Sequence, residues 1–149
     1  MVKIFCINTQ TSCTFPEGTA LMDMLPSFFP EGTSSYPIIA AKVNNVCQGL
    51  KYRAFNSRQV EFLDYTSYAG RSVYCSSLCF LFCKAVKDLF PESRIVLRRP
   101  ISKGYFCELD KGDGSVPCKA DVDAVSARMK EMVEADMPFR RHEVRTGVA

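Results

Sequence analysis

Short segments that favour strands, separated by turn residues, fill the first 65 residues of the chain. Pattern and propensity predict five strands: Val2–Ile7, Cys13–Phe15, Ile38–Val43, Tyr52–Phe55 and Val60–Tyr65. One short helix is predicted over Ala20–Leu25, with Thr19 as its cap and Pro26 as its end, because proline cannot continue the hydrogen-bond ladder. Asn44 and Asn45 predict a tight turn, since asparagine tolerates a positive φ. A single helix among short strands indicates an α+β unit with the helix on a mixed sheet.

A helical pattern begins after Gly70. Ser72–Phe90 is a long helix candidate that Ser72 can cap and Pro91 ends. Its residues are apolar nearly all round, so we expect this helix to be deeply packed. Two strands, Arg94–Leu97 and Tyr105–Leu109, are predicted next, with a loop between them.

A third helix is predicted from Asp121, its capping residue, to the stretch before Pro138. Its apolar residues recur at the spacing of one helical face: Val122, Val125, Met129, Met132 and Val133. Phe139–Val144 predicts a closing strand. The sequence therefore predicts two α+β domains, residues 1–67 and residues 70–149.

Composition is that of a folded protein, with 47% hydrophobic and 23% charged residues among 149. The net charge of +3 is too small to identify a nucleic-acid binder, so a basic face must be sought locally. No apolar run reaches the roughly 18 residues that span a bilayer. The first residues are too interrupted for a signal-peptide core, so we expect a cytoplasmic protein without a membrane partner.

Eight cysteines lie mostly within apolar segments, and no Cys-x-x-Cys occurs. This placement favours reduced, buried cysteines over a disulfide framework. Cys75, Cys79 and Cys83 are four residues apart and share one helical face. They fit either a thiolate metal site or a seam of small residues packed on a sheet. The seam is favoured because His142 is the one histidine that could complete a metal site.

No catalytic constellation is predicted in this chain. Gly112–Gly114 lacks the spacing of a phosphate-binding loop, and its glycines indicate a loop. His142 has no serine or cysteine partner that the sequence can assign, so we interpret it as a solvated strand residue.

Basic residues form a modest cluster that could bind RNA or another anion. The candidates are Arg98, Arg99, Lys103, Arg140 and Arg141. Arginine near aromatic residues suits RNA backbone and exposed bases, and Tyr105, Phe106 and Phe139 are close in sequence. Glu108 and Glu143 dilute the positive charge, so a solvated face stays open as the alternative.

The first 66 residues resemble the TGS domain, a ubiquitin-like β-grasp unit. The resemblance rests on Phe15–Thr19 (FPEGT) before a short helix, on Ala41–Asn45 (AKVNN) and on Val60–Asp64 (VEFLD). Asn45 stands where that family usually has glycine, a tolerable change in a tight turn. The implied fold class is α+β, a β-grasp domain followed by a second domain.

The second half is similar to part of the second domain of threonyl-tRNA synthetases. The similarity rests on Ala85–Pro91, on Ser102–Cys107, and on the Asp121–Met137 helix with the strand that follows it. In that family the long helix carries a His-x-x-x-His pair that helps form the editing site. Those positions hold Ser76 and Phe80 here, so the resemblance implies no metal site and no editing chemistry.

The same pair of domains also resembles the N-terminal extension of bacterial uridine (nucleoside) kinases. Leu78–Phe80, with Ala85–Pro91 and Ser102–Cys107, fits that variant better than a true synthetase. The implied function is a non-catalytic regulatory or ligand-binding module whose partner is a P-loop kinase domain of the same parent chain. ATP and magnesium are then expected for that kinase domain alone, with no cofactor in this chain. The alternative is an RNA-binding or degenerate editing module of a synthetase-like protein, and RNA or a nucleotide is the ligand class in view.

Overall fold

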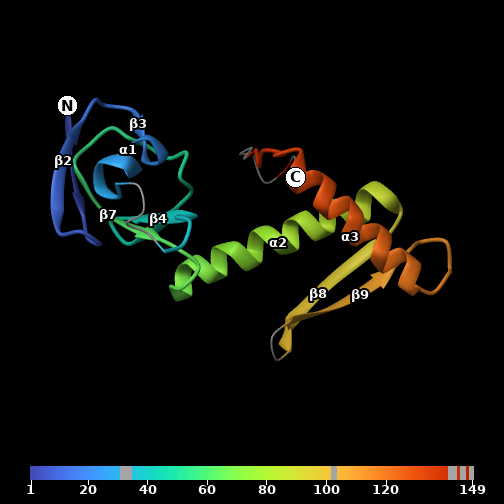
Figure 1. Ribbon diagram of the computed structural model, residues 1–149. Coiled ribbons are helices and arrows are strands. Elements are labelled where there is room, and N and C mark those ends of the chain that lie inside the picture. The colour runs from blue at the N-terminus through green and yellow to red at the C-terminus, as the bar shows by residue number, and fades with distance from the viewer. Residues whose placement is uncertain (31–34, 102–103, 141–143, 145–146, 148–149) are drawn as a thin grey trace. The chain divides into compact units, whose positions relative to one another are not determined.

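The computed structural model describes residues 1–30, 35–101, 104–140, 144 and 147, with the backbone alone described at 99–101. The chain divides into two compact units, Met1–Leu78 and Cys79–Ala149 (Figure 1). This division falls within helix α2 (Tyr68–Leu89), whereas the sequence placed the boundary just before that helix. Both units combine helices and strands, so the predicted α+β class is confirmed.

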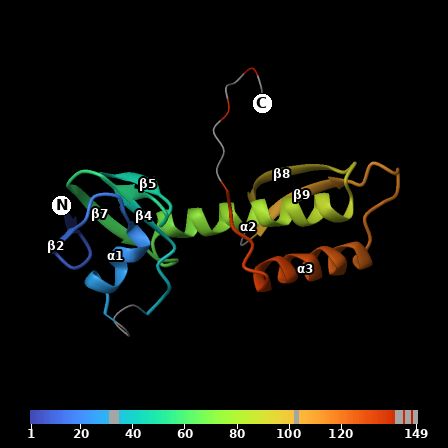
Figure 2. The same ribbon diagram turned by 90° about the horizontal axis from the view of Figure 1, so that it is seen from above.

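The first unit is a five-stranded mixed sheet with helix α1 (Leu21–Phe28) packed on one face (Figures 1 and 2). The strands, in sheet order, are β2 (Thr11–Phe15), β1 (Val2–Cys6), β7 (Arg58–Leu63), β4 (Ala40–Val43) and β5 (Val46–Gln48). The central pair, β1 and β7, is parallel, and the other pairs are antiparallel. Two short strands, β3 (Thr19–Ala20) and β6 (Arg53–Ala54), pair separately. This order is that of the β-grasp fold.

The core of the first unit forms because alternate strand residues point toward α1. On β1, Val2, Ile4 and Cys6 are buried while Lys3 is exposed. Helix α1 contributes Leu21, Met24 and Phe28 from its inner face. Full burial of one such side chain contributes about 1.5–3 kcal/mol, so this layer holds the unit together.

Helix α1 corrects two sequence-based predictions. Pro26 lies inside the helix instead of ending it. Proline lacks an N–H, so it removes one backbone hydrogen bond from the helix. Burial of Phe28 in the turn that follows offsets this loss. Thr19 is not the cap either, because its hydroxyl donates to the Pro16 carbonyl at 2.7 Å. The backbone carbonyls of Tyr52 and Leu50 accept the first helical N–H groups in its place.

In the second unit, a long hairpin and two helices surround a small core (Figure 2). The hairpin strands are β8 (Arg94–Ile101) and β9 (Gly104–Asp110), and helix α3 (Lys119–Glu134) follows them. Ala85 and Val86 of α2 and Val125 and Met132 of α3 are buried together. The described residues include no helix long and apolar enough to cross a membrane.

Helix α2 begins at Tyr68, four residues before the predicted cap Ser72. The hydroxyl of Ser67 accepts the Gly70 N–H at 3.0 Å and so caps the helix. The prediction of deep packing is wrong, because Tyr74, Leu78 and Phe80 are all exposed. An apolar sequence all round a helix therefore does not mean burial all round.

The hairpin is longer than the sequence predicted. Strand structure replaces most of the predicted loop after Leu97, with a register irregularity between Leu97 and Pro100. Proline lacks the N–H that a regular ladder requires, which accounts for an irregularity at this place. Residues 102–103 lie outside the described residues.

Helix α3 begins at Lys119 with Cys118 at the cap position, three residues before the predicted cap Asp121. Asp121 is the third helical residue, and its carboxylate accepts the Cys118 N–H at 2.9 Å. Of the predicted apolar stripe, Val125 and Met132 are buried, whereas Val122 and Val133 are exposed. The predicted closing strand is not formed at residues 139 and 140, and 141–143 lie outside the described residues.

Candidate nucleic-acid interface

Arg98 is the best-defined residue of the predicted basic cluster. Its guanidinium forms a forked pair with Glu108 across the hairpin, with Nε to Oε1 at 3.2 Å and Nη2 to Oε2 at 3.0 Å. The hydrogen bond to Glu108 raises the pKa of Arg98 further above its usual value. Both side chains are about half exposed, at 57% and 48%, so solvent screens the pair and it contributes little to stability.

A shallow hollow on this face of the hairpin carries both signs of charge. It is lined by Arg94, Val96, Arg98, Glu108, Leu109 and Asp110. Two cations thus face two carboxylates, because the strand pairing places Arg94 opposite Asp110 and Val96 opposite Glu108. The sequence-based expectation that Glu108 dilutes the basic cluster agrees with this geometry.

The other candidates are less well placed by the structure. Arg99 lies in β8, where the backbone alone is described, and Lys103 and Arg141 lie outside the described residues. Arg140 is exposed and follows α3 in irregular structure.

Ser76 and Phe80 lie one helical turn apart on α2, and both are exposed. The Phe80 ring packs against Phe139, with ring centroids 5.5 Å apart and planes at 48°. Neither a hydroxyl nor a phenyl ring replaces imidazole as a metal ligand. Within the described residues, no three His, Cys, Asp or Glu side chains gather as a possible metal site.

Three thiols come near one another where α2 meets β9. Burial, and next the neighbouring Cys79, raise the pKa of Cys83. Burial, then Cys83 and Cys79, raise the pKa of Cys107. A raised pKa keeps a thiol protonated at neutral pH. Cys79, Cys83 and Cys107 are also partly buried, as expected of a seam of small residues.

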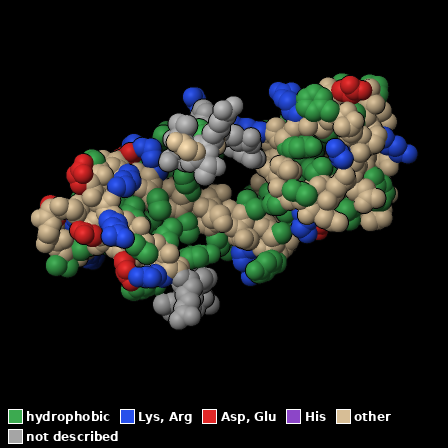
Figure 3. Space-filling view, turned by 180° about the vertical axis from the view of Figure 1, so that it is seen from behind, with side chains coloured by type: hydrophobic (Ala, Val, Ile, Leu, Met, Phe, Trp, Pro, Cys, Tyr) green, Lys and Arg blue, Asp and Glu red, His purple; other side chains and the backbone are tan. Residues whose placement is uncertain are grey.

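The expectation that the cysteines are mostly buried is wrong. All eight are free thiols, but Cys6 alone is buried, and Cys47 and Cys118 are exposed. Figure 3 shows other hydrophobic side chains also reaching the surface. Cys47 lies on the edge strand β5 and Cys118 stands at the cap position before α3, and both positions are open to solvent.

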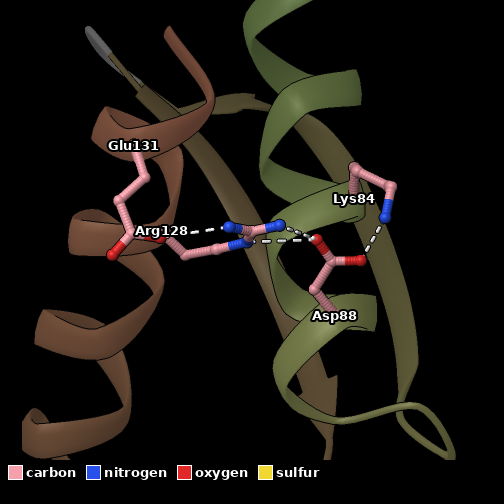
Figure 4. A network of polar contacts seen from close by, with 4 residues as sticks. All are labelled: Lys84, Asp88, Arg128 and Glu131. Atoms are coloured by element: carbon pink, nitrogen blue, oxygen red, sulfur yellow. Dashed lines mark hydrogen bonds and ion pairs between the residues drawn. The ribbon is translucent and has the colours of Figure 1, made fainter. Parts of the chain in front are cut away.

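The sequence did not identify the polar network that joins α2 and α3 (Figure 4). Arg128 of α3 contacts Oδ2 of Asp88 through Nη2 and Nε, at 2.9 and 3.1 Å. Lys84 bonds the other oxygen of Asp88, and Glu131 accepts from Arg128 at 3.0 Å. The hydrogen bond from Lys84, then that from Arg128, lowers the pKa of Asp88. The i, i+4 spacing of Lys84 and Asp88 was the available signal.

A second hollow, in the first unit, was also missed. It is lined by Lys3, Phe5, Asn44, Asn45, Ser57, Arg58 and Gln59. These residues are scattered along the sequence and meet because β1 pairs with β7 and because the β4–β5 turn lies beside β7.

The chain is similar to threonine–tRNA ligases over most of its length. It is 29% identical to that of Syntrophomonas wolfei over 130 residues, which are 87% of this chain and 20% of the ligase. It is 24% identical to that of Clostridioides difficile over 144 residues, which are 97% of this chain and 22% of the ligase. Against that of Parafrankia sp., 30% identity extends over 72% of this chain. No protein-family model matches.

The chain therefore spans about a fifth of the length of the curated relatives it matches. These relatives support the resemblance to threonyl-tRNA synthetases. They give no support to the uridine (nucleoside) kinase interpretation, the first hypothesis from the sequence. The alternative, a module of a synthetase-like protein, is better supported.

Proposed function

We propose that this chain is an RNA-binding module of a threonyl-tRNA-synthetase-like protein, and that its ligand is tRNA. The observation that carries the proposal is the similarity to proteins named threonine–tRNA ligase, which extends through both units of the chain. The cytoplasmic location predicted above belongs to this proposal. No cofactor held by this chain is part of it.

The side chains at the editing-site positions support RNA binding without editing activity. The positions of the two editing-site histidines are filled by Ser76 and Phe80, and Phe139 packs on the Phe80 ring. This leaves neither a proton-transfer group nor a metal ligand at either position.

Arg98 is the residue we propose for the RNA contact. It is held by one exposed carboxylate, and an exposed ion pair is worth about 1 kcal/mol or less, so a phosphate can replace Glu108 at small cost. A guanidinium binds phosphate oxygens through the same two-pronged geometry that it uses for carboxylate.

The test is tRNA binding to the full chain across a salt series, with two opposed variants. Arg98→Gln should weaken tRNA binding several-fold and reduce the slope of log affinity against log salt concentration by about one. Glu108→Gln removes the competing carboxylate and should strengthen binding. Equal binding by both variants would show that Arg98 serves the hairpin alone, and absence of salt-dependent tRNA binding by the unchanged chain would refute the proposal.

A hydrolysis assay on mischarged threonine tRNA tests whether the chain edits tRNA as well as binding it. The chain should leave mischarged threonine tRNA intact at concentrations that saturate binding. Accelerated deacylation that Ser76→Ala abolishes would restore the editing alternative.

A further inference from the structure

The hollow of the first unit is built from three segments that the β-grasp sheet brings together. Lys3 and Phe5 come from β1, Arg58 and Gln59 from β7, and Asn44 and Asn45 from the turn between β4 and β5. Ile4 pairs with Arg58, and the Asn44 N–H donates to the Gln59 carbonyl at 2.9 Å. Regular sheet structure, and not a loose loop, therefore fixes its walls.

Two side chains of this hollow, Ser57 and Asn44, accept hydrogen bonds from backbone N–H groups and keep their own donor hydrogens free. The Ser57 hydroxyl oxygen accepts the Lys3 N–H at 3.1 Å, so its own hydrogen is available to a ligand. The Asn44 side-chain oxygen accepts the Gln59 N–H at 3.0 Å, which leaves the NH₂ group of that amide. A surface that offers mainly donors suits an anion.

The charges agree with this assignment. Lys3 and Arg58 line the hollow, and among the residues that the structure describes no carboxylate lines it. Neither cation has an ion-pair partner in the part of the chain that the structure describes. The hairpin hollow differs in this respect, because Arg98 pairs with Glu108 there and Asp110 also lines it. Two uncompensated cations beside neutral donors are a typical setting for phosphate.

Phe5 adds an aromatic surface beside these cations. Its ring is half-buried and lines the same hollow. Bases stack on aromatic side chains without strict sequence preference. We propose that this hollow binds a nucleotide unit, with its phosphate on Lys3 and Arg58 and its base against Phe5. The site lies in the first unit and does not involve Arg98, so it goes beyond the tRNA contact proposed above.

Titration of the full chain with adenosine 5′-monophosphate and with a single-stranded ten-nucleotide adenylate tests this site. The double change Lys3→Gln and Arg58→Gln should weaken the binding of either probe by about tenfold or more. For the oligonucleotide, it should also reduce the slope of log affinity against log salt concentration by about one to two. The matched control changes Lys51→Gln and Lys119→Gln, which removes the same charge outside the hollow and should change binding less than twofold. Lys3 is exposed, so Lys3→Gln alone serves if the double variant does not fold.

Phe5→Leu separates stacking from charge. It should weaken nucleotide binding about fivefold or more and leave the binding of inorganic phosphate unchanged. Saturation by the mononucleotide identifies a free nucleotide as ligand, whereas binding of the oligonucleotide alone identifies an RNA strand. The inference is overturned if neither probe saturates in the millimolar range, or if the double variant matches its control. The variants tested here are in the first unit and those of the tRNA proposal are in the hairpin, so failure here is distinct from failure of that proposal.

Discussion

Gly70 stands in the first turn of α2, close to the backbone that leads into the helix. A Cβ built on this glycine would meet the Asp64 carbonyl oxygen at 1.8 Å and the Ser67 hydroxyl oxygen at 2.8 Å. Alanine normally favours a helix over glycine by about 1 kcal/mol. At this position the contact with a backbone atom reverses the preference, because the backbone cannot move aside as a flexible side chain does.

Gly70→Ala should therefore destabilise the first unit by about 1–3 kcal/mol, in line with the cost of overpacking. Denaturant unfolding followed by circular dichroism measures the change. Gly49→Ala is the matched control, since nothing lies within 4 Å of a Cβ there. A Gly70→Ala variant as stable as that control would show that the turn around Asp64 yields easily.

Asn45 shows how a residue can depart from a family pattern without changing the turn. Asn44 and Asn45 adopt φ angles of 47° and 67°, so both are left-handed. Asparagine tolerates this region better than most residues, which is why it can stand where TGS domains usually have glycine. The tight turn predicted from these two residues is confirmed.

At the scale of elements, the sequence predicted most helices and strands and misplaced several of their ends. Periodicity marks α2 and α3, but the cap of α2 is Ser67 and the capping carboxylate of α3 sits inside the helix. These ends depend on side-chain hydrogen bonds that apolar spacing does not encode. The hairpin strands continue past Leu97 because cross-strand pairing overrides the turn propensity of residues there.

The candidate site was predictable only in part, for a related reason. The sequence alone identified Arg98 and anticipated Glu108 as a diluting charge, and the resemblance to threonyl-tRNA synthetases implied the loss of both histidines. The sequence did not predict the two-pronged pair of Arg98 with Glu108, and it did not predict that Lys3 and Arg58 line the same hollow. Both arrangements come from strand register, which is fixed by tertiary packing.

Asp88 gives the contact between α2 and α3 a dependence on pH. Lys84 and Arg128 lower its pKa below the value near 3.8 of an unpaired aspartate. A lowered folded-state pKa stabilises the fold above the unfolded-state pKa, and that stability is lost as the pH falls through the folded-state pKa. The pair is partly exposed, so the effect is small.

Asp88→Asn should lower the stability of the second unit at pH 7 by about 1 kcal/mol or less. The difference from the unchanged chain should shrink as the pH falls below about 4. Thermal unfolding between pH 7 and pH 2.5 measures it, with Asp123→Asn, a change at an exposed aspartate of α3, as control. A difference that persists undiminished at pH 2.5 would assign Asp88 a packing role instead of an electrostatic one.

At the scale of the whole molecule, each unit has its own core. Leu21 of the first unit is fully buried with Met24, Ile4 and Val60. Met132 of the second unit is 2% exposed and packs with Val86 and Val125. The first core is the larger, which predicts that the second unit opens more readily.

Leu21→Ala and Met132→Ala should each destabilise one unit by about 2–5 kcal/mol, the usual cost of truncating a buried side chain. Hydrogen exchange followed by mass spectrometry resolves the two units. Exchange in β1 and β7 reports on the first unit, and exchange in α3 and in the part of α2 after Leu78 reports on the second unit. Leu21→Ala should accelerate exchange in β1 and β7 and leave α3 unchanged, while Met132→Ala should do the reverse. Val133→Ala, beside Met132 but 65% exposed, should alter neither pattern. If either core variant accelerates exchange throughout the chain, the units unfold as one cooperative structure and the separate-core prediction is wrong.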